Sequence, residues 1–175
     1  MQSEAAVQHE REQKIKTLTQ GVLCQTVQKV LSSVILGYEG TQIMFNFTVI
    51  QCDQDLLQAL VNCASQSLMG SQFRVKCVPT AICMLVANTS KDTKIVMDPT
   101  LDQLKTMRAE FSHKVFIVAD SQKEEFVYSQ ITPIAWTSDA EHQNSLALDF
   151  TGLEMIMGTG LSCCKKMHDF VVSQA

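Results

Sequence analysis

The sequence predicts an α+β domain, on three observations. A long amphipathic helical pattern opens the chain, several alternating or continuously apolar runs typical of β-strands occupy its middle, and another helical pattern closes it. No repeat, linker or change of composition divides these patterns. The 175 residues, of which 46% are hydrophobic, are enough for one sizeable core. We therefore expect residues 1–175 to form a single domain.

The first two elements are a helix and a strand. Between Gln8 and Val34 apolar residues recur at intervals of three and four, which predicts an amphipathic helix ended by Gly37 and Gly40. Residues 42–50 then alternate between apolar and polar side chains and are rich in aromatic and β-branched residues. This alternation predicts a β-strand.

A second helix is predicted directly after two aspartates. Asp53 and Asp55 are typical N-cap residues, and the apolar residues from Leu56 onward have helical spacing as far as Gly70. A carboxylate at an N-cap accepts hydrogen bonds from free backbone N–H groups of the first turn. We expect helix capping to be the role of these two aspartates.

The middle of the chain predicts most of the sheet. Residues 81–87 form a continuous apolar run, which suits a buried strand, although periodicity alone leaves a helix open. Further strands are predicted at residues 94–98, 114–119 and 125–131, the first as the hairpin partner of the apolar run. Residues 101–113 fit a helix or a strand equally well.

The last element is a helix from Phe150 to Val171, with apolar residues at helical spacing. Gly158 and Gly160 fall inside it, where each costs about 1 kcal/mol relative to alanine. We expect both glycines to be kept for close packing against another element.

Composition excludes several classes of function. The net charge is −4 with only three arginines, which argues against a protein that binds nucleic acid on its own. No apolar run approaches the roughly 18 residues of a membrane span, and the first residues lack the features of a secretory signal. We expect a soluble, intracellular protein.

The cysteines and histidines predict no metal site and no cofactor. The seven cysteines show no C-x-x-C spacing, and the four histidines complete no ligand set. Small buried side chains in a reducing compartment are the favoured interpretation of the cysteines, and a catalytic thiol with a distant histidine is the minor alternative.

Three stretches resemble the RNase PH fold. They are Gln13–Leu18 with Leu23, Val49–Asp53 continuing into Leu57–Ser65, and Ile95–Thr100. The last, followed by a hairpin that carries Glu124-Glu125-Phe126, is most similar to the non-catalytic ring subunits of the eukaryotic RNA exosome. The resemblance covers residues 10 to 172. It implies an RNase PH-like layered domain (ribosomal protein S5 domain 2-like) that lacks the N-terminal strands.

The resemblance also implies a function. The chain would be a structural subunit of a hetero-oligomeric ring of RNase PH-like subunits, with self-association when isolated. It would serve RNA processing, including rRNA processing, and 3′-to-5′ RNA degradation in the nucleus, nucleolus and cytoplasm. It would touch RNA weakly or indirectly.

The chain departs from the family at the phosphate site. Phosphorolytic members carry arginines on the first helix and a Thr-Arg or Ser-Arg pair at the start of the second. The matching positions here are Thr17, Gly21, Leu56 and Leu57. Leucine cannot hold an anion as a guanidinium does, so the resemblance predicts a catalytically inactive subunit.

The acidic positions leave an enzymatic alternative open. Active members carry an aspartate near Asp98 and a second six residues later, where this chain has Leu104, with Asp102 out of step. A residual phosphorolytic 3′ exoribonuclease would have to use Asp53, Asp55, Asp98 and Asp102. Asp98 before Pro99 is more typical of a turn.

Four basic residues are candidates for contact with RNA. They are Arg74, Lys76, Lys105 and Arg108. Residues with this spacing more often form a solvated face.

Overall fold

The computed structural model shows one antiparallel sheet between helices. It describes residues 4–37, 40, 42–51, 53, 55–88, 93–100, 102–103, 111–134 and 150–174. The elements are α1 (Glu4–Val34), α2 (Leu56–Met69), β1 (Pro79–Asn88), β2 (Thr93–Met97), β3 (His113–Asp120), β4 (Glu125–Pro133) and α5 (Phe150–Gln174). The predicted α+β class is confirmed. Of residues 101–113, residues 101 and 104–110 lie outside the described part.

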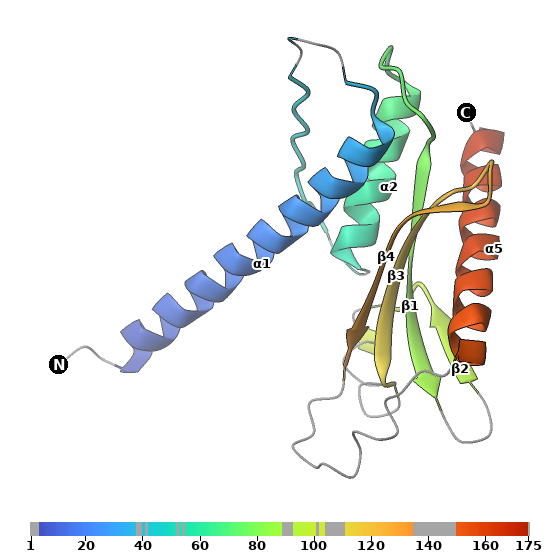
Figure 1. Cartoon of the computed structure of the whole chain (residues 1–175). Helices are drawn as coiled ribbons and strands as arrows, with labels where there is room; N and C mark the ends of the chain where they lie inside the picture. Colours follow the sequence, from blue (N-terminus) through green and yellow to red (C-terminus); the bar gives the residue numbers. More distant parts are fainter. Residues whose placement is uncertain are drawn as a thin grey trace.

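The four strands are ordered β2-β1-β3-β4, and every neighbouring pair is antiparallel. α1 and α2 lie on one face of the sheet and α5 on the other (Figure 1). Both predicted hairpins are present, since β1 pairs with β2 and β3 pairs with β4. The apolar run at residues 81–87 is buried throughout, as expected of a central strand covered on both faces.

Alternate side chains of the strands build two apolar layers. Ala81, Phe116 and Val118 join residues of α1 and α2 in one layer. Met84, Val115 and Ile117 join Ile156 and Cys164 of α5 in the other. Period-two alternation of the strands places the two sets on opposite faces.

The two glycines of α5 differ. A Cβ atom at Gly160 would overlap Cδ1 of Ile117 and would lie 3.1 Å from Cε of Met84, so this glycine does allow a close approach to the sheet. At Gly158 a Cβ atom would meet no heavy atom within 4 Å. The packing interpretation is therefore confirmed for Gly160 and wrong for Gly158.

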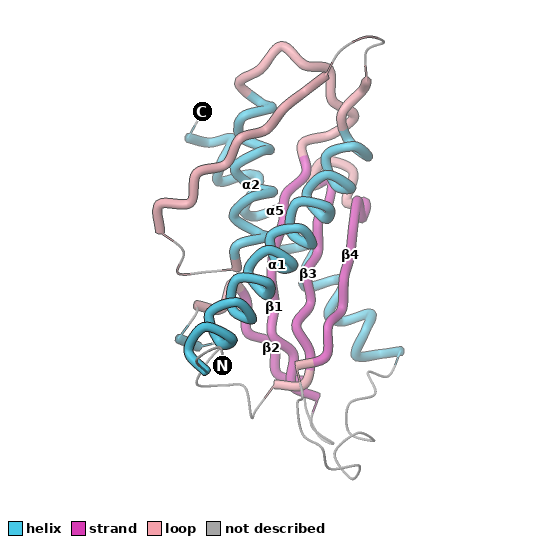
Figure 2. The backbone as a smooth tube through the Cα atoms, turned by 90° about the vertical axis from the view of Figure 1, so that its left-hand side faces the viewer, coloured by secondary structure: helices cyan, strands magenta, loops and turns pink. Residues whose placement is uncertain are grey.

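The strand predicted at residues 42–50 is absent. The stretch is extended and does alternate, with Ile43, Phe45 and Phe47 half-buried between exposed neighbours, but it belongs to no β-ladder. It runs back from the end of α1 toward the start of α2, on the outer margin of the molecule (Figure 2). The alternation follows from packing against α1 and α2 and requires no pairing with the sheet.

α1 is buried only in part. Among its side chains that the structure describes, from residue 19 onward, those of Thr26 and Val27 are the first that are buried. The N-terminal end of the helix extends away from the sheet (Figure 1). None of the described helices is both long and apolar enough to cross a membrane.

Candidate functional site

The N-terminus of α2 is closed by Asp55. This residue is the N-cap, and its Oδ1 accepts a hydrogen bond of 3.1 Å from the backbone N–H of Gln58. Its side chain is only 7% exposed. The capping role expected of Asp55 is thus confirmed, whereas Asp53 is exposed and accepts a 2.6 Å hydrogen bond from Nε2 of Gln51.

Lys114 of β3 pairs with the same carboxylate. Its Nζ donates to Oδ2 of Asp55, and 34% of the Lys114 side chain is exposed. Burial alone would lower the pKa of Lys114, but the hydrogen bond to Asp55 and the charge of Asp55 outweigh it and raise that pKa above its ordinary value. The lysine charge is therefore neutralised by the cap.

Gln58 connects α2 to two further elements. Its Oε1 accepts from the backbone N–H of Cys83 at 2.6 Å, and its Nε2 donates to Oδ1 of Asp98 at 3.1 Å. Asp98 directly follows β2 with a φ of 50°, and its own N–H donates to the carbonyl of Cys83 at 2.9 Å. The prediction that Asp98 is a turn residue is confirmed. We call Asp55, Gln58, Asp98 and Lys114 the α2-start cluster.

Polar side chains of α2 bind the free edge of β1. β2 pairs with β1 only from Met84 onward, so within the described part of the chain no strand lies along the edge from Pro79 to Cys83 on that side. Gln58 bonds to Cys83, and Asn62 bonds to both the N–H (2.8 Å) and the carbonyl (3.0 Å) of Ala81. Ser65 donates to the carbonyl of Pro79. Residues spaced by three and four on α2 thus replace a β-ladder along that edge.

The cluster is poorly suited to binding an anion. A free helix N-terminus attracts phosphate through its N–H groups and dipole. Here the Asp55 carboxylate already takes the N–H of Gln58 and the charge of Lys114. The one lysine of the α2-start cluster is thus already paired with a carboxylate, so the cluster offers a phosphate no uncompensated cation of its own.

The other positions of the expected phosphate site add no cation. Leu57 packs against the core layer formed with α1, and Leu56 is half-buried. Gly21 lies in an exposed part of α1, where a Cβ atom would meet nothing within 4 Å. Thr17 lies one turn earlier in α1.

The basic residues proposed for RNA are only partly described. Arg74 and Lys76 are both exposed at the end of α1, where their segment forms an isolated bridge between Ile35 and Val75. Lys76 donates from Nζ to the carbonyl of Ser33 at 3.1 Å, so it stabilises the C-terminal end of α1. Lys105 and Arg108 lie outside the described residues.

The described residues include no cluster of three or more histidine, cysteine or acidic side chains able to hold a metal ion. Of the six cysteines that the structure describes, two are buried, and burial raises the pKa of Cys83 and of Cys164 to about 12. Thiols with such pKa values are protonated at neutral pH and are poor nucleophiles. Asp102 is exposed, and position 104 lies outside the described residues.

No family model and no curated protein matches the sequence. Among solved structures the chain is similar to rice (Oryza sativa) Rrp46, an RNase PH-like exosome subunit, with a TM-score of 0.61 and 15% sequence identity. The two share an RNase PH-like fold. The similarity covers 86% of this chain but 62% of Rrp46, so the chain spans less than two thirds of the length of that protein.

The sequence predicts Asp55 as a helix cap and Asp98 as a turn residue, but it gives no sign that Gln58 and Lys114 lie beside them. Nothing in the local pattern distinguishes Gln58 from the other glutamines of the chain, because its role depends on where β2 stops. Lys114 is adjacent to Asp55 only through the sheet order, which the sequence did not provide.

Proposed function

We propose that the protein is a structural, catalytically inactive subunit of an RNase PH-like exosome ring that serves RNA processing and 3′-to-5′ RNA degradation. It would act in the nucleus, including the nucleolus, and in the cytoplasm. Its partners would be other RNase PH-like subunits, and its own contacts with RNA would be weak.

The observation that carries this proposal is the state of the α2 N-terminus. Asp55 caps it, Lys114 is paired with that cap, and Leu56 and Leu57 follow where an anion-binding pair would stand. Phosphorolysis needs phosphate held beside the RNA backbone, which requires several cationic and N–H donors directed at one point. A neutralised cation beside two leucines does not meet that requirement.

A ring role rests on the fold shared with rice Rrp46 and on the resemblance of residues 10–172 to non-catalytic ring subunits. A subunit without a phosphate site can still shape a channel, because this task needs surface complementarity and no reacting group. The net charge of −4 agrees with a protein that binds RNA only as part of a larger complex.

Reconstitution tests the ring role. The purified chain is mixed with RNase PH-like subunits, and the masses formed are measured by light scattering and native mass spectrometry. We expect one defined hetero-oligomer that contains this chain. A chain that stays outside every assembly under conditions where the other subunits close into rings would contradict the proposal.

A second experiment tests inactivity. Single-stranded RNA is incubated with the chain, phosphate and Mg²⁺, with a catalytic RNase PH-like subunit as the positive control. We expect no release of nucleoside diphosphates, and phosphate titration should leave the NMR signal of the Gln58 amide unchanged. Release of diphosphates, or saturable movement of that amide signal, favours the residual nuclease instead. The double variant Asp55→Ala/Leu57→Arg is the matched comparison, because it removes the capping carboxylate, which frees the N–H of Gln58, and adds a guanidinium.

A further inference from the structure

A thiol and a thioether meet where β2 lies beside α5. The Sγ atom of Cys163 on α5 lies 2.8 Å from the Sδ atom of Met97, the last residue of β2, although the two residues are 66 positions apart in the sequence. Figure 1 shows β2 alongside the first half of α5, and Ile95 of β2 packs against the same apolar layer as this helix. Two soft ligand atoms from two different elements are thus directed at one point.

A third sulfur atom comes from the next turn of α5. Met167 lies four residues after Cys163 and therefore on the same face of the helix. Both residues pack against the layer that contains Ile156 and Cys164. Long side chains of a helix point back toward the preceding turn, so the thioether of Met167 points toward Cys163.

The sulfur atoms are accessible from solvent. The side chain of Met97 is 48% exposed, and those of Cys163 and Met167 are half-buried. A methionine that only fills a gap in a core is buried, so core filling does not account for the position of Met97. Behind the sulfur atoms lie apolar side chains, among them Ile95 and Leu161. An ion can therefore reach the three sulfur atoms from one side, while the other side excludes water.

The chemistry of these ligands selects one class of ion. Thiolate and thioether ligands favour Cu(I), whereas Mg²⁺ and Ca²⁺ take oxygen ligands and structural zinc takes four nitrogen or sulfur ligands. We propose that Cys163, Met97 and Met167 form a binding site for a soft monovalent cation of the Cu(I) class. The proposal does not rest on the ring function. On binding, the thiol of Cys163 releases its proton to solvent, and the thiolate neutralises the charge of the cation without any change of oxidation state.

The geometry requires one small movement. With metal–sulfur bonds of about 2.3 Å, three ligands around one ion lie about 4 Å apart. The sulfur atoms of Cys163 and Met97 must therefore separate by about 1 Å. Methionine is unbranched and has several rotatable bonds, and Met97 is exposed, so its side chain can make this movement while the backbone of β2 and α5 stays in place.

Anaerobic titration of the full chain with Cu(I) measures the site. Bicinchoninate serves as the competing chelator, and millimolar glutathione removes copper from single thiols. We expect native mass spectrometry to show one bound ion, and the dissociation constant to rise at least about tenfold in each of Met97→Leu, Cys163→Ser and Met167→Leu. The matched controls are Met155→Leu, an exposed methionine of the same helix, and Cys63→Ser, an exposed cysteine of α2, and both should bind like the unchanged chain.

A second measurement needs no variant and so does not depend on the folding of one. Ag(I) has the same preference for sulfur and no redox chemistry under these conditions, and the methyl signals of the methionines report its position by NMR. The signals of Met97 and Met167 should shift on titration with Ag(I), and that of Met155 should not.

Three results would overturn the proposal. One is an unchanged dissociation constant in any of the three sulfur variants, since loss of Cys163 alone would indicate ordinary binding to a single thiol. Another is a Met97 methyl signal that Ag(I) leaves in place. The third is Zn²⁺ that displaces Cu(I) at equal concentration, which would indicate a ligand set other than these three sulfur atoms.

Discussion

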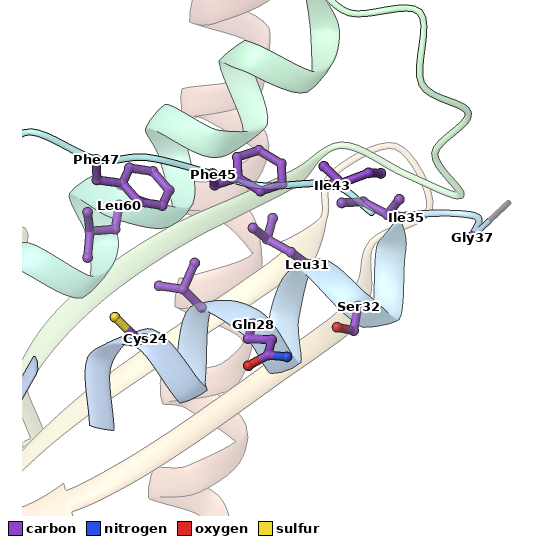
Figure 3. Close-up of a pocket in the computed structure, with 11 residues that line it drawn as sticks. Cys24, Gln28, Leu31, Ser32, Ile35, Gly37, Ile43, Phe45, Phe47 and Leu60 are labelled. Atoms are coloured by element: carbon purple, nitrogen blue, oxygen red, sulfur yellow. The ribbon is translucent and has the colours of Figure 1, made fainter. Parts of the chain in front are cut away.

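The two faces of the sheet are covered in different ways. On the α5 face the helix lies directly on the strands, with Ile156 and Cys164 fully buried and Gly160 admitting the side chain of Ile117. On the other face α2 is held partly by hydrogen bonds from Gln58, Asn62 and Ser65. There α1 borders an open groove of about 520 Å³, with Ile43, Phe45 and Phe47 along its other wall (Figure 3).

This difference separates the parts that stabilise the chain from the parts that can bind. Close apolar packing provides stability without leaving anything exposed to a partner. A groove bordered by half-buried aromatic residues is less closely packed and leaves apolar surface accessible. We expect substitutions on the α5 face to change stability more than substitutions around the groove.

The largest effect expected from this comparison concerns one large aliphatic side chain on each face. Ile156→Ala should lower the free energy of unfolding toward the upper end of the range of about 2–5 kcal/mol, because no neighbour can fill the cavity. Leu31→Ala should cost nearer the lower end, because Leu31 borders the groove and water and side chains can occupy the space. Urea unfolding at concentrations where the chain is monomeric measures both. Equal losses would show that the faces are equally tight.

The two glycines of α5 test how closely this helix packs on the sheet. Gly160→Val should destabilise by about 1–3 kcal/mol through overlap with Ile117 and Met84. Gly158→Ala, two residues away with no atom within 4 Å of the added Cβ, should instead stabilise by up to about 1 kcal/mol. Thermal unfolding of the pair measures the difference. A loss at Gly158 similar to that at Gly160 would mean that α5 does not lie on the sheet as described.

The polar contacts of α2 are expected to matter less than these. Gln58→Leu leaves the N–H of Cys83 and a carboxylate oxygen of Asp98 without the glutamine partner, which should cost about 1–3 kcal/mol. Gln66→Leu, exposed on the same helix, should change the free energy of unfolding by no more than about 0.5 kcal/mol. Urea unfolding of both variants measures the effect, and a Gln58 variant as stable as the Gln66 control would show that the bonds to β1 contribute little.

The sequence predicts local features well and spatial neighbours poorly. Helical periodicity, the Asp55 cap and the Gly70 stop depend on residues close in the chain, and all three agree with the structure. The alternation at residues 42–50 is present in the structure, but a strand also needs a partner, and pairing is not a local property. Gly158 and Gly160 look alike in the sequence because only the position of Ile117 distinguishes them. The α2-start cluster depends on the sheet order, which placed Lys114 beside Asp55.

The smallest expected effect is a pH dependence at the Asp55–Lys114 pair. The folded chain holds the Lys114 proton more tightly than the unfolded chain, because its folded pKa lies above the ordinary 10.5. The pair therefore stabilises the fold fully below that pH, and its contribution is lost as pH rises through the folded pKa. In Lys114→Met this loss is absent, so the stability difference between the unchanged chain and the variant should shrink as the pH is raised above 10.5. Urea midpoints measured at several alkaline pH values give this difference directly, and Lys166→Met, an exposed lysine on α5, is the control. A difference independent of pH would mean that the lysine contributes through packing of its aliphatic stem rather than through its charge. It would also remove the argument that the cap neutralises this cation.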